Sequence, residues 1–98
     1  MQSIEEYCGD LEDFLEDNDE VDADSLVCVA SGVSVYAERL ARALKSSKNR
    51  MICPIWEKLF FLSRWVLKHP ESVADEEVRG TILFTVAQVY QAMEWGLI

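Results

Sequence analysis

The segment EDNDEVDAD, residues 16–24, is the part of the chain whose side chains come closest to a cation site. It holds six carboxylates in nine positions, and no lysine or arginine precedes Arg39. A calcium-binding loop needs oxygen ligands at positions 1, 3 and 5, glycine at position 6 and glutamate at position 12. Counted from Asp17, position 5 is valine, position 6 is Asp22 and position 12 is Cys28. The segment therefore lacks the pattern of a calcium loop.

The cysteines and the single histidine are the remaining candidates for metal binding or catalysis. A structural zinc site needs about four clustered Cys or His ligands, whereas Cys8, Cys28, Cys53 and His69 are widely spaced and include no C-x-x-C pair. Each cysteine lies on or beside an apolar stripe, so we expect three unpaired, buried thiols. The chain also has no phosphate loop, dinucleotide motif or nucleophile elbow. We therefore expect no metal, no cofactor and no enzymatic activity.

Composition and charge narrow the class of protein. The chain has 98 residues, half of them apolar, and a net charge of −9, which predicts one globular domain over residues 1–98. The charge disfavours nucleic acid or an anionic membrane as a partner and favours a basic protein. The N-terminus MQSIEEYCGD has neither the basic start nor the apolar run of a signal peptide. The sequence therefore predicts a cytoplasmic protein.

Four amphipathic segments supply the elements that would position these side chains. Apolar residues recur at three- and four-residue spacing, and the pattern predicts helices over residues 4–17, 24–46, 54–69 and 75–95. Ser3 and Glu6 form a capping box at the N-terminus of the helix predicted over residues 4–17. Asp22 or Asp24 could cap the second helix.

The helix ends and one strand-like stretch complete this assignment. Pro54 suits the first turn of the third helix, and Gly96 suits the end of the fourth. The stretch SLVCVASGVSVY is rich in valine like a strand, but it runs directly into the strong helix former AERLARALK. We therefore assign all of it to the second helix.

These helices predict an all-α fold, an antiparallel four-helix bundle of up-down-up-down topology. A three-helix core with one helix docked aside is the alternative. The third helix is apolar around most of its circumference, so we expect it to lie centrally. The small residues Ala30, Ser31 and Gly32 should let a neighbouring helix approach the second one closely.

The topology would gather acidic residues at one end of the bundle. The first and third connections would lie at one end, forming an acidic pole with Glu71, Asp75, Glu76 and Glu77 beside the 16–24 segment. We expect Arg39, Arg42 and Lys45 to pair with Glu5 and Glu6 across the first two helices. The carboxylates of residues 16–20 have no such internal partner, so they are either a solvated loop or a surface for a partner's Lys and Arg.

Two aromatic residues fall on polar lines of the predicted helices. Phe61 shares a line with Glu57, Arg64 and Lys68, and Trp95 lies near Gln88 and Gln91. Exposed aromatics near arginine are enriched at interfaces, although single exposed aromatics also occur without a role. We expect Phe61 or Trp95 to lie in a partner contact or in a homodimer contact. The candidate partner-binding residues are Glu16, Asp17, Asp19, Glu20, Asp22, Asp24, Phe61 and Trp95.

Binding is the function class that these observations favour. The leading hypothesis is an inhibitor of the immunity-protein type, which neutralises a basic toxin such as a nuclease by covering its site with carboxylates. The alternative is a secretion chaperone or adaptor that shields a client's apolar helix with the aromatic third and fourth helices. A carboxylate-dependent hydrolase is a third hypothesis, but it lacks a site. Salt should weaken the charge-driven complex and spare the apolar one.

Overall fold

A computed structural model describes residues 2–47 and 49–98 of the chain. These residues form four α-helices and two short 3₁₀ helices, and they include no strand. The elements in chain order are α1 (Ile4–Asp17), α2 (Leu26–Lys45), η1 (Arg50–Ile52), α3 (Cys53–Lys68), η2 (Pro70–Ala74) and α4 (Glu76–Glu94). The all-α prediction is confirmed, and each predicted helix boundary lies within two residues of the observed one. None of the helices in the described part combines the length and the apolar character that crossing a membrane requires.

Local signals explain most of the helix ends. The Ser3 hydroxyl accepts a hydrogen bond from the Glu6 backbone N–H at 3.1 Å, as the capping box predicts. Pro54 lies in the first turn of α3, where its missing N–H costs no helical hydrogen bond. The Asp75 carboxylate caps α4 by accepting from the Glu77 N–H at 2.9 Å. Gly96 ends α4 with a φ of 76°, in the left-handed region that glycine adopts without strain.

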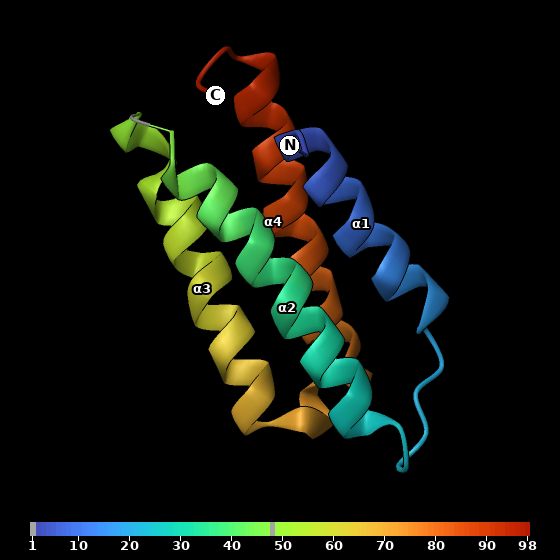
Figure 1. Cartoon of the computed structure of the whole chain (residues 1–98). Helices are drawn as coiled ribbons and strands as arrows, with labels where there is room; N and C mark the ends of the chain where they lie inside the picture. Colours follow the sequence, from blue (N-terminus) through green and yellow to red (C-terminus); the bar gives the residue numbers. More distant parts are fainter. Residues whose placement is uncertain (1, 48) are drawn as a thin grey trace.

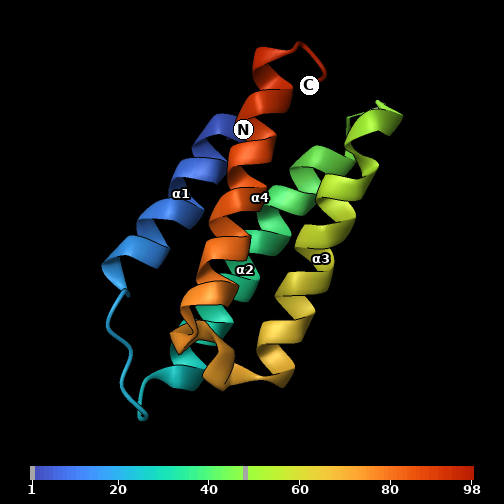
Figure 2. The same ribbon diagram turned by 180° about the vertical axis from the view of Figure 1, so that it is seen from behind.

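Helix α2 is the central element of the bundle. It packs against α3, α1 and η2, and Figure 1 draws it between α1 and α3. Figure 2 shows the molecule from behind, with α4 in front of α2 and between α1 and α3. The strand-like residues 26–36 lie within α2, so the helical assignment is confirmed. The expectation of a central third helix is wrong, because one apolar side of α3 stays partly or largely exposed at Trp56, Phe60 and Leu67.

The core consists of buried apolar residues from every helix. Its largest fully buried side chains are Leu11, Leu40, Leu44, Ile52, Leu59, Ile82, Val33, Val66, Val73, Val86 and Val89, together with Thr85. They form one cluster, with partly buried Tyr, Trp and Phe residues packed around it. This continuous core fits one globular unit.

Helices α1 and α2 approach each other closely at Gly32. A Cβ added at Gly32 would lie 2.1 Å from Cζ of Phe14, so only glycine leaves room for this ring. The ring also packs against Tyr36, with the centroids 5.1 Å apart. The predicted close approach at the small patch of α2 is therefore confirmed, and its partner is α1.

We predict opposite effects of alanine at two helical glycines. Gly32→Ala should lower the free energy of unfolding by about 1–2 kcal/mol, because overpacking against Phe14 outweighs the better helix propensity of alanine. Gly80→Ala is the matched control, since a Cβ there meets nothing within 4 Å. It should raise stability by about 0.5–1 kcal/mol. Urea denaturation of both variants measures the difference, and equal stabilisation by both would show that the ring moves aside.

The cysteines differ in exposure. All three are unpaired, as predicted, and Cys8 is buried. Burial, reinforced by the nearby Glu12 and Glu5 carboxylates, raises the pKa of the Cys8 thiol to about 12. Cys53 is partly exposed and Cys28 is exposed. The expectation that all three thiols are buried is therefore wrong, because Cys28 lies in the first turn of α2 on the side away from the core.

Thiol labelling should separate the three cysteines at pH 8. Cys28 should react fastest with a disulfide reagent in the folded protein, and Cys8 should react only after unfolding. The reason is that the thiolate is the nucleophile and Cys8 keeps its proton until the pH approaches 12. Mass spectrometry of labelled peptides, with and without urea, provides the measurement. Rapid labelling of Cys8 in the folded state would contradict the packing of α1.

Candidate protein-binding surfaces

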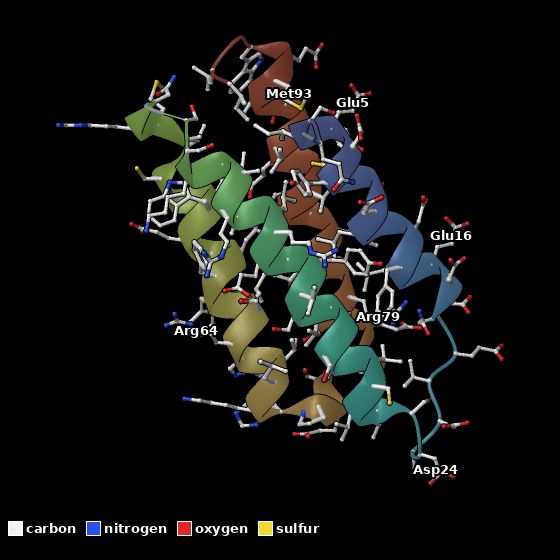
Figure 3. The ribbon with its side chains drawn as sticks, viewed as in Figure 1. Glu5, Glu16, Asp24, Arg64, Arg79 and Met93 are labelled. Atoms are coloured by element: carbon white, nitrogen blue, oxygen red, sulfur yellow. The ribbon has the colours of Figure 1, made fainter. Side chains whose placement is uncertain are left out.

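The acidic segment occupies the end of α1 and the connection to α2. Glu16 and Asp17 lie in the last turn of α1, and Asp19, Glu20 and Asp24 lie in the connection. All of these side chains are exposed. Figure 3 shows Glu16 and Asp24 extending away from the bundle. The structure thus places the predicted acidic residues on one continuous stretch of surface.

Asp22 differs from its neighbours because its carboxylate is used within the connection. It accepts hydrogen bonds from the Ser25 backbone N–H at 2.9 Å and from the Ser25 hydroxyl at 2.8 Å. These bonds to Ser25 lower the pKa of Asp22. The residue preceding α2 is Ser25, and no side chain caps the helix there. The expectation that Asp22 or Asp24 caps α2 directly is wrong, since Asp22 forms the turn before it.

Arg79 is the residue that sequence reasoning missed at this surface. It lies near the start of α4, and its guanidinium donates to the carbonyl oxygens of Asn18 at 2.9 Å and Val73 at 3.1 Å. It also donates to the carbonyl of Leu15. The one available signal was its position as the single basic residue of segment 69–98, but its partners are distant in sequence.

Arg79 offsets the negative charge at the C-terminal end of α1. The last turn of α1 holds no basic residue, although the negative end of a helix dipole favours a cation there. Glu16 and Asp17 make that end more negative still. Arg79 supplies the missing positive charge from α4. It also lines a groove with Glu12, Glu16, Asp19 and Leu83.

The carboxylates of residues 16–24 form no ion pair with any residue in 2–47 or 49–98. Within the described residues, Arg42 pairs with Glu38 at 3.1 Å, and Nδ1 of His69 lies 3.6 Å from the Glu71 carboxylate. The expected pairing of Arg39, Arg42 and Lys45 with Glu5 and Glu6 is therefore wrong.

The three basic residues of α2 have other neighbours. The Arg39 guanidinium lies 5.6 Å from the Tyr36 ring centre, and Lys45 Nζ lies 5.4 Å from that of Trp56. Arg42 is bound by Glu38 on its own helix. The charges of α2 are thus taken up along α2 and α3, and α1 keeps its excess of negative charge.

The two aromatic candidates lie on separate surfaces. The exposed fraction is 64% for Phe61 and 68% for Trp95. Phe61 lines a groove on the outer side of α3 with Trp56, Phe60 and Trp65. Trp95 follows α4 and lines a different groove with Met51 and Leu97. Both are available for a contact, and their role in one stays a prediction.

The candidate metal ligands of the described residues lie apart from one another. No group of three or more His, Cys, Asp or Glu side chains in residues 2–47 and 49–98 is arranged to hold a metal ion. His69 follows the end of α3, with its ring 5.1 Å from that of Trp65, and faces Glu71. The surfaces that remain are charged or aromatic, and both kinds suit contact with another macromolecule.

No known protein family, curated protein or solved structure matches this chain.

Replacement of Arg79 should destabilise the fold. We expect Arg79→Met to lower the free energy of unfolding by about 2–4 kcal/mol, because it removes charge-assisted hydrogen bonds to backbone carbonyls. Arg79→Lys should recover only part of this, since an ammonium group lacks the planar fork that reaches several acceptors. Urea denaturation is the measurement.

Arg50→Met provides the control for Arg79→Met. Arg50 is exposed, and exposed substitutions of this kind usually change stability by about 0.5 kcal/mol or less. Equal effects of the two arginine replacements would contradict the structural role of Arg79.

Proposed function

We propose that this protein is an inhibitor of the immunity-protein type, which binds a basic partner through the acidic segment 16–24. Its target would be a protein whose functional site carries Lys and Arg, such as a nuclease. The observation that carries this proposal is the set of exposed carboxylates at Glu16, Asp17, Asp19 and Glu20, which form no ion pair among the described residues. Charge of one sign left unpaired on a surface favours fast association with a partner of opposite sign.

The proposal includes an up-down-up-down bundle with one acidic pole. In this arrangement the 16–24 segment and the α3–α4 connection form a single surface with Glu71, Glu76 and Glu77. Arg79 supports it, because its hydrogen bonds to Asn18 and Val73 hold the first and third connections near each other. Figures 1 and 2 also draw both connections at the same end of the bundle.

The proposed mechanism is occlusion. The carboxylates would take the places of phosphate groups in the partner's basic site and so exclude its anionic substrate. Carboxylates on the exposed rim should mainly speed association, whereas removal of one that is buried against arginine would cost about 2–5 kcal/mol of binding free energy. Asp22 is already bonded to Ser25, so we assign the main contribution to the residues before it. Location in the cytoplasm belongs to the same proposal.

The test compares two double neutralisations of equal charge. Asp19→Asn with Glu20→Gln alters the acidic segment. Glu5→Gln with Glu94→Gln is the control, and Figure 3 shows Glu5 at the opposite end of α1 from Glu16. Each tagged variant is used to purify partners from the native cells, with elution in steps of NaCl. The partner recovered is then purified, and its activity is titrated with each variant.

The proposal predicts a basic partner that the wild type and the control inhibit equally. The acidic-segment variant should keep its thermal stability and associate with that partner at least tenfold more slowly, and high salt should remove most of the difference. Equal association by both variants, or a partner without a basic site, would reject recognition and leave the segment as a solvated loop.

A second candidate function is a secretion chaperone or adaptor that binds an apolar client helix. The exposed aromatic groove of α3 supports it. The salt dependence of the complex separates the two candidates, since apolar contact persists at high ionic strength.

A further inference from the structure

The outer face of α3 carries an aromatic and charged pattern that stays partly open to solvent, although Lys45 of α2 lies over the rings of Trp56 and Phe60. Its lining residues are Trp56, Glu57, Phe60, Phe61, Arg64, Trp65 and Lys68. Phe61 is largely exposed, and the other three aromatic side chains are partly exposed. Figure 3 shows Arg64 pointing away from the bundle. Contiguous apolar surface of this kind marks interaction sites.

The arrangement follows from helix geometry. At 100° per residue, Leu59, Leu62 and Val66 point into the core. Glu57 and Arg64 are seven residues apart, so they lie on one line of the outer face and are separated by about 10.5 Å. That separation is too long for an ion pair within the helix. Phe60 and Phe61 flank the line on its two sides, halfway between the charges.

We propose that this face is the interface of a symmetric homodimer in which two α3 helices pack antiparallel. A twofold axis perpendicular to the helices, passing between Phe60 and Phe61, would place Glu57 of each copy opposite Arg64 of the other. The two ion pairs are equivalent by symmetry, as an isologous interface requires. The same axis brings Phe60 against its symmetry mate on one flank and Phe61 against its mate on the other.

The charge pattern favours a second copy of this chain over a foreign helix. A helix face is self-complementary when opposite charges lie at equal distances on either side of its centre. Glu57 and Arg64 meet this condition, each about 5 Å along the axis from the midpoint. An apolar face selected for a foreign acidic helix would need basic residues on both sides. The only acidic residue in the α3 groove is Glu57, at the position that the twofold axis requires.

The size of the interface predicts a weak dimer. One pair of helices buries less surface than the roughly 1,600 Å² of a standard interface, so we expect a dissociation constant in the micromolar range. The dimer does not depend on the proposed inhibitor function, because α3 lies apart from the 16–24 segment.

Charge reversal tests the register of the dimer. Sedimentation equilibrium over a concentration series gives the dissociation constant of each variant. Glu57→Arg or Arg64→Glu alone should weaken dimerisation at least tenfold, because each places like charges opposite each other. The double variant with both reversals should return to within about threefold of the wild-type dissociation constant. The restored ion pairs regain the tenfold loss of affinity, which corresponds to about 1.4 kcal/mol. An equimolar mixture of the two single variants should form a heterodimer, because one then carries two cations and the other two anions on the line.

A matched pair of aromatic replacements tests the apolar contact. Phe61→Ser should weaken the dimer at least tenfold, and Trp95→Ser should leave it unchanged, although the two side chains are similarly exposed at 64% and 68%. Circular dichroism melts check that each variant is folded. A wild-type protein that stays monomeric at millimolar concentration would overturn the proposal and leave this face to a foreign partner. Self-association that the double reversal fails to restore would overturn the antiparallel register.

Discussion

The Arg79 guanidinium joins three parts of the chain through hydrogen bonds to backbone carbonyls. Leu15 is at the end of α1, Asn18 begins the acidic connection, and Val73 belongs to η2. A helix end needs partners for its last carbonyls. The Asn18 amide donates to the Phe14 carbonyl at 2.9 Å, but the acidic side chains of the last turn cannot donate to the Leu15 carbonyl. The cation from α4 satisfies the Leu15 carbonyl and offsets the local negative charge. The position of the acidic segment on the surface therefore depends on one residue of the fourth helix.

Small residues alternate with Leu40 and Leu44 on the buried side of α2, the central helix. Ala30, Ala37 and Ala41 are almost fully buried, and Gly32 admits the Phe14 ring. Small side chains let neighbouring helices approach from several directions, while the bulky stripe of α3 fills only one side. On the other apolar side of α3, Trp56 and Phe60 are only partly buried and Leu67 is exposed. The aromatic residues on the outer face of α3 are therefore left on the surface of the bundle.

The central position of α2 also separates the charges of its neighbours. Helix α1 carries the acidic side, and its carboxylates are not neutralised by the arginines of α2, one of which is bound to Glu38. Helix α3 carries basic residues beside aromatic rings, as Lys58 near Phe84 illustrates, with Nζ 5.6 Å from the ring centre. A molecule built this way presents different chemistry on different sides. The acidic segment and the α3 face are therefore chemically distinct surfaces.

The helices themselves were determined by local sequence. The Ser3 capping box, Pro54 and Gly96 act within a few residues of where they stand, so the helix spans could be predicted to within two positions. The exposure of the acidic residues also followed from composition, because crowded carboxylates stay in water.

Only the tertiary structure decided which helix is central, how exposed Cys28 is and what Arg79 binds. Asn18 and Leu15 lie 61 and 64 residues from Arg79 in the chain, and no spacing rule reaches that far. Periodicity identifies an apolar stripe, but it does not say whether a neighbouring helix covers that stripe. Burial is a property of packed neighbours, and the neighbours are chosen by the fit of side-chain shapes across the whole bundle.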